Sequence, residues 1–187
     1  GQALGLIGHL AATTQLPSDL GGGPSLDPSA HLAHLDPAPP FEAIADSRVP
    51  LHLQLLAAAF AVGCADAARD MAAEYAKMRE QFDRPIGWFQ ALKHMCSDMA
   101  VRSAVARSQL YYAACALDAD DADAAFHIAS AKQLADQAAV ENGRANIQVH
   151  GGIGMTDEAY PHLCLKRAHL LSFVAPARRE IILGEDA

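Results

Sequence analysis

The chain has 187 residues, enough for one compact domain and a short appendage. Alanine and leucine dominate its composition and aromatic residues make up only 6%, which favours closely packed helices and argues against an all-β fold. Its 22 acidic and 14 basic side chains give a formal net charge of −8, and a surface of that sign repels nucleic-acid phosphates.

The first 50 residues are predicted to be a linker, or the remnant of missing N-terminal domains. They hold seven of the ten prolines and six of the 13 glycines, and residues 21–40 among them show neither a helical nor a strand period. Within them, residues 3–16 are apolar enough for a short helix if something packs on it. A start at Gly1 rather than Met leaves open that the chain is part of a longer protein.

Three long helices are predicted after this region. Between Leu51 and Met78, apolar residues recur every three or four positions, and Pro85 then breaks the chain. From Phe89 to Leu117 the spacing alternates between three and four residues, as in a heptad seam. A third helix, rich in alanine, is expected from Ala124 to Val149, with Asp123 as its cap.

The C-terminal part is predicted to hold two shorter helices. Thr156 or Asp157 would cap a fourth helix that runs toward Leu171, and residues 177–187 would form a fifth. Three long antiparallel helices and a shorter fourth define an all-α fold, an up-and-down four-helix bundle over residues 51–187. We find no unbroken apolar run of bilayer-spanning length and no basic segment before the mildly apolar start, so we expect a cytoplasmic protein.

Metal and nucleophile chemistry are not predicted. The nine histidines show no HExxH-like spacing, and the acidic stretch from Asp118 lacks the glycine and terminal glutamate of a calcium loop. No GxSxG motif marks an activated serine. The cysteines form no CxxC pair, so we expect buried free thiols in a reducing compartment; they are Cys64, Cys96, Cys115 and Cys164.

The first group of residues that points to a ligand lies at the junction of the two first helices. Arg79 offers a planar fork suited to a phosphate or carboxylate, Phe82 a flat face for an aromatic ring, and Gln90 a paired donor and acceptor. Trp88 and His94 lie nearby. From spacing alone, a salt-bridged arginine and a structural aromatic cluster explain this turn at least as well.

The second group is the segment QVHGGIGMTDE, where the third helix ends. Consecutive glycines allow backbone N–H groups to approach an anion, and the N-terminus of the following helix adds a favourable dipole. Glycines are also common at helix C-termini for conformational reasons alone. A helix rather than a strand precedes the turn, so it is not the GxGxxG motif of dinucleotide-binding folds.

Together, AEYAKMREQFDRPIGWFQALKH and QVHGGIGMTDEAYPHLCLKRA resemble the C-terminal helical domain of the acyl-CoA dehydrogenase family. The resemblance covers residues 51–187. It implies a four-helix bundle at the core of a tetramer, with FAD at a subunit interface and its adenine-diphosphate end held by the neighbouring subunit. By motif it assigns seven residues to FAD: Arg79 to the pyrophosphate, Phe82 to the adenosine half, Phe89 and Gln90 from the FQ pair, and Gln148, Gly151 and Gly152 from QxxGG.

The family's catalytic glutamate, which abstracts the α-proton of the acyl-CoA, is missing. Its usual position near the C-terminus falls within residues 175–177, Ala-Pro-Ala, and its alternative position on the first helix falls at Leu53. The substrate-side arginine falls at Gln54, and Asp83 replaces the glycine of RxxFG. Alanine and leucine cannot accept a proton, and the chain lacks room for the family's other two domains, so dehydrogenation by this chain alone is not expected.

Two explanations remain open: the chain belongs to an oligomer with a catalytic partner, or it is part of a longer protein. The favoured hypothesis is a subunit of a heteromeric (α2β2) or homomeric acyl-CoA dehydrogenase that clamps FAD for a partner holding the acyl-CoA, similar to the mixed tetramers of sterol side-chain degradation. A flavin-free scaffold is the second hypothesis. The third is an enzyme with another base, such as Glu180.

Overall fold

The computed structural model describes residues 2–7, 10–16, 21–33 and 40–184. The chain forms two compact units, Gly1–Leu53 and Gln54–Ala187, and each is described by itself.

The first unit contains short paired strands. β1 (Gln2–Ile7) pairs antiparallel with β2 (Leu10–Gln15), and β5 (Glu42–Ala43) joins the other edge of β2. β3 (Gly23–Pro24) and β4 (His31–Leu32) form a second pair. The helix predicted over residues 3–16 is therefore wrong, and residues 8 and 9 of that stretch lie outside the described residues. Pairing β2 with two strands satisfies backbone groups that a short isolated helix would expose.

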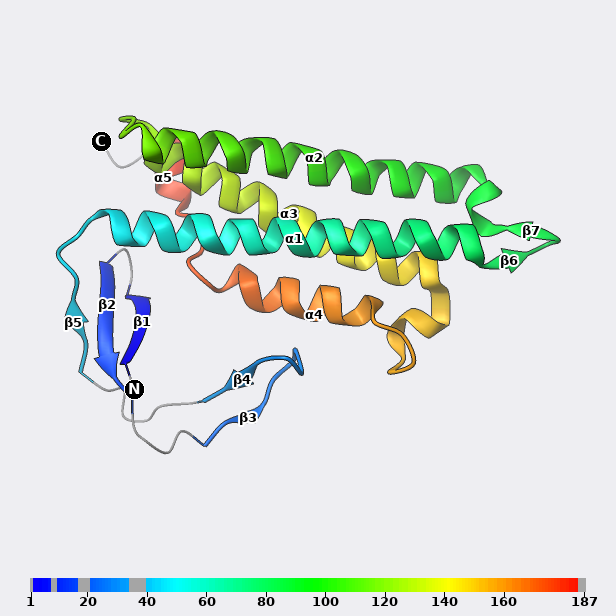
Figure 1. Cartoon of the computed structure of the whole chain (residues 1–187), viewed down its shortest axis with the longest axis horizontal. Coiled ribbons are helices and arrows are strands. Elements are labelled where there is room, and N and C mark those ends of the chain that lie inside the picture. Colours follow the sequence, from blue (N-terminus) through cyan, green and yellow to red (C-terminus); the bar gives the residue numbers. More distant parts are fainter. Residues whose placement is uncertain (1, 8–9, 17–20, 34–39, 185–187) are drawn as a thin grey trace. The chain divides into compact units, whose positions relative to one another are not determined.

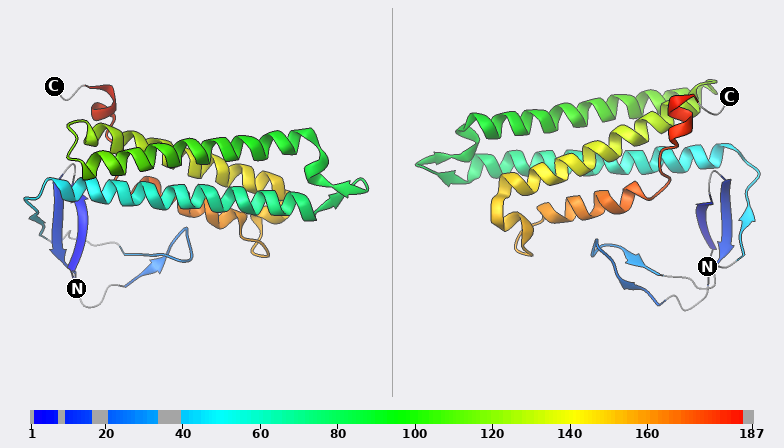
Figure 2. Two further views of the ribbon diagram at one scale, coloured as in Figure 1. Left: turned by 45° about the horizontal axis from the view of Figure 1, so that its top comes forward. Right: turned by 180° about the vertical axis from the view of Figure 1, so that it is seen from behind.

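The second unit is a helical bundle, as predicted (Figure 1). Its helices are α1 (Arg48–Met78), α2 (Gln90–Asp118), α3 (Ala124–His150), α4 (Pro161–Ser172) and α5 (Arg179–Leu183). Figure 2 shows α1, α2, α3 and the shorter α4 lying along one another from two further sides. The chain reverses between α1 and α2 through β6 (Glu80–Gln81), β7 (Arg84–Pro85) and the 3-10 turn η1 (Ile86–Trp88). Between α3 and α4 it passes through η2 (Gly151–Met155).

Alanine fills most of the core of the bundle. The buried face of α1 carries an alanine at nearly every third or fourth position from Ala57 to Ala76, and these residues pack against alanines and leucines of the other helices. Small side chains let helices approach closely. Gly143 of α3 marks such an approach, because a Cβ there would lie only 3.0 Å from the Cα of Leu165 in α4.

One buried amide ties the three long helices together. Asn142 of α3 is fully buried, and its Nδ2 donates to the carbonyl oxygens of Ala65 in α1 and Met99 in α2 at 3.2 and 3.0 Å. The same nitrogen lies 3.1 Å from the hydroxyl oxygen of Ser103. This cluster fixes the register of α1, α2 and α3 in the middle of the bundle.

Several local predictions are wrong. Asp123 precedes α3 but makes no side-chain capping bond, and α4 starts at Pro161, beyond Thr156 and Asp157. Proline at the first helical position is preorganised for a helix start, which accounts for the later beginning. The cysteines are free but not buried, since Cys115 is exposed and the other three are half-buried. Alanines occupy the innermost positions and leave the larger thiols at their edges.

The sequence was expected to contain no apolar stretch long enough to cross a bilayer, and the longest helix, α1, departs from that expectation. By length and composition alone, α1 is apolar enough to cross a membrane. Its alanine face packs in the bundle core, and such core helices pass the same test. The predicted fifth helix is present as α5; residues 185–187 of that prediction lie outside the described part of the chain.

Candidate functional site

The candidate site lies where α1 ends and α3 ends. The chain leaves α1 at Met78 and turns at Phe82 and Asp83, which have φ angles of 56° and 59°. Two successive left-handed residues suit a tight hairpin between β6 and β7. Aspartate tolerates this conformation better than most residues, so the turn keeps its shape although Asp83 stands where the family motif has glycine.

At the end of α3, Gly151 supplies the conformation that the turn requires. Its φ of 65° and ψ of −143° lie in a region that essentially only glycine adopts. Its own N–H bonds to the carbonyl oxygens of Ile147 and Gln148 and closes the helix. Gly151 therefore shapes the turn, and its amide is not free to bind an anion.

These two segments line one cavity of about 340 Å³. Arg79 reaches it from the end of α1, while Gly151 and Gly152 border it from the end of α3. The Arg79 side chain is exposed and has no hydrogen-bond or ion-pair partner among the described residues. A Cβ added at either glycine would meet no atom within 4 Å, so both face open space. A cationic fork and two glycines without side chains thus border one cavity, which leaves room for an anion beside Arg79.

Two aromatic rings that sequence reasoning did not assign also line this cavity. Tyr75 of α1 stacks on His150 of α3, with ring centroids 4.0 Å apart and an interplanar angle of 24°. His150 Nδ1 lies 2.9 Å from the carbonyl oxygen of Asn146. The position of His150 inside the QxxGG segment was a signal in the sequence. Its contact with Tyr75 was not, because it depends on the packing of helices far apart in the chain.

The other predicted residues are not all brought to this cavity. Phe82 and Phe89 meet edge to face with centroids 5.9 Å apart, and Phe82 is 81% exposed. Gln90 is exposed at the start of α2. Gln148 lines a separate cavity of about 510 Å³ between α2 and α3, together with His94.

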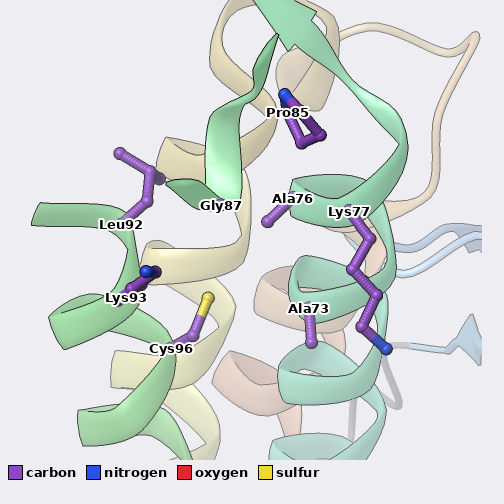
Figure 3. A pocket seen from close by; sticks show the side chains of 8 residues that line it. All are labelled: Ala73, Ala76, Lys77, Pro85, Gly87, Leu92, Lys93 and Cys96. Atoms are coloured by element: carbon purple, nitrogen blue, oxygen red, sulfur yellow. The ribbon is translucent and has the colours of Figure 1, made fainter. Parts of the chain in front are cut away.

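A third cavity, of about 350 Å³, lies between α1 and α2 beneath η1 (Figure 3). Its walls are largely apolar, and none of the seven predicted residues lines it. Gly87 closes one side, where a Cβ would lie 2.9 Å from the carbonyl oxygen of Ala76. Figure 3 shows the Cys96 sulfur directed into the space between the helices, and burial raises the pKa of this thiol. A thiol so shifted is a poor nucleophile at neutral pH.

The family resemblance assigns the usual position of the base to residues 175–177 and the substrate-side arginine to Gln54, and these residues meet at another corner of the bundle. Gln54 Nε2 donates to the carbonyl oxygens of Ala175 and Pro176 at 3.3 and 2.7 Å. Gln54 is buried, and Ala175 has a left-handed φ of 46°. A neutral amide therefore fills the space beside residues 175–177, and these groups provide no proton acceptor strong enough for α-proton abstraction.

A further carboxylate, the half-buried Asp136, takes part in a structural ion pair. Lys132 of α3 is fully buried, pairs with Asp136, and donates from Nζ to the carbonyl oxygen of Leu171 at 3.2 Å. Burial raises the pKa of the Asp136 carboxyl, and Lys132 opposes that shift. Glu180 is exposed on α5 and lies 3.9 Å from Arg178. It lines none of these three cavities.

Comparison with known proteins identifies the family. Residues 51–175 match the family model "Acyl-CoA dehydrogenase, C-terminal domain", and the chain belongs to this family. It is 37% identical over 163 residues to the acyl-CoA dehydrogenase IpdE2 of Mycobacterium tuberculosis, an alignment that covers 84% of this chain and 48% of that protein. The chain thus spans about half the length of this curated relative.

Solved structures agree with the fold. The ChsE4–ChsE5 complex of Mycobacterium tuberculosis aligns with a TM-score of 0.70 and 25% identity, over 87% of this chain and 48% of the other. The Tcur3481–Tcur3483 steroid ACAD aligns with a TM-score of 0.76 and 24% identity, over 94% of this chain and 50% of the other. The second likeness concerns the fold alone.

Acyl-CoA dehydrogenases are FAD-dependent flavoproteins, and the cavity at the ends of α1 and α3 suits part of that cofactor. A diphosphate needs cationic and polar donors beside open space. Arg79 is exposed there without a described partner, and the Cβ positions of Gly151 and Gly152 are empty. The residues present therefore fit the diphosphate.

Proposed function

We propose that this chain is the nucleotide-holding subunit of an FAD-dependent acyl-CoA dehydrogenase whose catalytic glutamate lies on a partner subunit. One observation carries the proposal: Arg79, Gly151 and Gly152, from segments about seventy residues apart, line the same cavity. Beside residues 175–177, where the family resemblance puts the usual position of the base, Gln54 bonds to backbone carbonyls. The chain keeps groups that hold a cofactor and lacks the group that begins the reaction.

Each residue then has a defined task. The Arg79 guanidinium would offset the charge of the diphosphate, and the absence of side chains at Gly151 and Gly152 would let it approach the backbone. Phe82, Phe89, Gln90 and Gln148 would contact the adenosine half, with FAD shared across a subunit interface. When bound, FAD supplies the hydride acceptor for α,β-dehydrogenation of an acyl-CoA thioester. This chain would position FAD and offset the charge of its diphosphate. Both contributions would raise the rate of dehydrogenation only when the partner supplies the catalytic base.

The proposed assembly is a hetero-oligomer, α2β2, in the cytoplasm. Two similar structures are complexes of differently named chains, and one of them is described as a steroid ACAD. We extend these properties to this chain: a distinct catalytic partner and, as substrate class, the acyl-CoA of a steroid side chain. Residues 1–50 would be a linker or the remnant of the family's N-terminal domains.

Arg79→Ala in the co-purified complex tests the proposal. Flavin content per complex, measured from absorbance and intact mass, should fall at least about tenfold, because a charge-assisted bond to the diphosphate is lost. Arg84→Ala is the matched control. It removes an exposed arginine from the same hairpin, but one that lies over the Trp88 ring, 5.3 Å from its centroid, rather than in the cavity. Equal flavin content in wild type and Arg79→Ala would refute the assignment.

A flavin-free scaffold is the alternative, and one observation favours it. Gln90 and Gln148 lie outside the cavity that holds Arg79, so the predicted contacts do not form one continuous site within this chain. The purified complex decides between the two functions: a colourless complex that releases no FAD on denaturation would identify a scaffold. Turnover by the chain purified alone would instead support a third function, catalysis with another base.

A further inference from the structure

His150 lines the proposed diphosphate cavity in a fixed orientation. Its ring stacks on Tyr75 at 4.0 Å, and its Nδ1 lies 2.9 Å from the carbonyl oxygen of Asn146, four residues earlier in α3. Two independent contacts thus hold the ring in place. Its other nitrogen, Nε2, makes no hydrogen bond with any described residue.

The bond to Asn146 decides which nitrogen carries the proton. A carbonyl oxygen can only accept, so Nδ1 must be the donor, and in the neutral ring Nε2 is then a bare acceptor. A bare lone pair repels a phosphate oxygen. After protonation, Nε2 becomes a charged donor and attracts it.

We propose that His150 is a second ligand of the diphosphate beside Arg79, and that it takes up a proton when the nucleotide binds. The inference rests on the proposed function and adds a residue and a pH dependence to it. A diphosphate diester carries two negative charges, and Arg79 supplies one positive charge. Protonated His150 supplies the second.

None of the other side chains that line the cavity is of a type that takes up a proton near neutral pH. Around the cavity, α1 contributes the Tyr75 phenol and the Arg79 guanidinium, and β6 contributes the amide of Gln81. The residues from η1 and η2 are Ile86 and the segment from Gly151 to Ile153, which have no titratable side chains. Tyrosine and arginine side chains are not of a type that gains or loses charge near neutral pH, so an imidazole is the one side-chain type in this lining that can take up a proton there.

ADP-ribose is the probe, because it carries the nucleotide half of FAD and its diphosphate diester does not titrate near neutral pH. Isothermal titration of the full chain at pH 6 and pH 8, in buffers of different ionisation enthalpy, measures both affinity and proton uptake. We expect affinity about tenfold higher at pH 6 and net uptake of up to one proton, because the protonated ring adds a charged donor to the diphosphate.

His150→Phe preserves a ring for the Tyr75 stack and removes both nitrogens. It should bind ADP-ribose equally at the two pH values and without proton uptake. His52→Phe is the matched control, because His52 Nδ1 lies 2.8 Å from the carbonyl oxygen of Arg48 in the same i to i−4 arrangement but lines none of the three cavities. This control should retain the wild-type pH dependence.

The outcomes separate this inference from the proposed function. If wild type and His150→Phe share one pH profile while Arg79→Ala loses binding, the role of His150 is wrong and the diphosphate site stands. If wild type binds ADP-ribose at neither pH, both are overturned. Should His150→Phe not fold, His150→Gln replaces it, because an amide can donate but does not titrate; a pH dependence retained in that variant also overturns the inference.

Discussion

The cavity end and the corner at Gln54 belong to one helical bundle but differ in what they leave exposed. At the cavity end, Arg79 and the surfaces of two glycines face open space. At the other corner, Gln54 is buried and both of its amide bonds go to the backbone at residues 175 and 176. One region has unused capacity for a ligand, and the other uses its polar groups to hold the chain together.

Under the proposed function, the difference shows how one bundle can offer space for a diphosphate at one end and hold no base at the corner around Gln54. Binding a diphosphate needs charge and space, which a helix end and a glycine turn supply locally. Proton abstraction needs one carboxylate at one place, and a single substitution removes it. In this chain the neutral Gln54 amide occupies the corner and bonds to the loop after α4.

Gln54→Glu should have the largest effect, because it places a carboxylate in a buried corner where the neighbouring polar groups are acceptors. The variant would place negative oxygens against two carbonyl acceptors in a buried site, at a cost of about 3 kcal/mol in the free energy of unfolding at pH 8. Protonation relieves the repulsion, so the loss should shrink at pH 4. Urea unfolding at both pH values measures it.

Gln90→Glu is the control for that substitution, since it makes the same chemical change at an exposed position at the start of α2. A helix N-terminus favours negative charge, so its stability should stay within about 0.5 kcal/mol of wild type. A Gln54→Glu variant as stable as this control would show that the corner can hold a carboxylate, and the contrast between the two regions would disappear.

Alanine substitutions at the paired glycines sharpen the description of the cavity end. Gly151→Ala should lower the free energy of unfolding by about 2 kcal/mol, because φ 65° and ψ −143° strain any residue with a Cβ. Gly152 has no such φ, so Gly152→Ala should change stability by under about 0.5 kcal/mol while its methyl group narrows the cavity and weakens ADP-ribose binding. Equal losses of stability would contradict the separate roles.

The helical part of the fold was readable from the sequence. Apolar spacing located α1, α2 and α3 to within about three residues at each end. A helical pattern that repeats over many turns remains recognisable even where single residues depart from it. The β1–β2 hairpin was not readable, since its pairing depends on contacts between strands rather than on a local period. The predicted helix caps were wrong for a related reason. Asp123 and Thr156 are residue types that often cap helices, but Asp123 makes no side-chain capping bond and α4 begins beyond Thr156.

For the candidate site, motif residues were readable and their neighbours were not. Arg79 and Gly151 stood out through charge and conformation. The Tyr75–His150 stack and the bond from Gln54 to Pro176 join segments more than seventy residues apart, so they depend on how helices pack. No local pattern encodes such contacts in a single sequence.

Asp136 of α3 is a half-buried carboxylate that pairs with the buried Lys132. Burial raises the pKa of the Asp136 carboxyl, so the folded chain holds this proton more tightly than the unfolded chain does. Its contribution to stability is therefore present at acidic pH and lost as pH rises through the raised pKa. The free energy of unfolding of wild type minus that of Asp136→Asn should be larger at pH 4 than at pH 7.

Asp70→Asn is the matched control with the opposite sign. A hydrogen bond from Arg69 lowers the pKa of the exposed Asp70 carboxyl, so its contribution is present at neutral pH and is lost as pH falls through that pKa. The free energy of unfolding of wild type minus that of Asp70→Asn should be larger at pH 7 than at pH 4. This change with pH should be smaller in size than the one for Asp136→Asn. The same slope for both variants would mean that burial does not govern Asp136.

The smallest effect compares backbone strain in the two regions directly. Ala175 and Asp83 both have left-handed φ angles, 46° and 59°. Glycine relieves such strain but also gains entropy in the unfolded chain, so each substitution should change stability by under about 1 kcal/mol. Aspartate tolerates the left-handed region better than alanine does, so Ala175→Gly should stabilise the protein more than Asp83→Gly, as thermal unfolding would measure. A larger gain at Asp83 would place the greater strain in the hairpin beside the cavity, and the Gln54 corner would then be the more relaxed of the two regions.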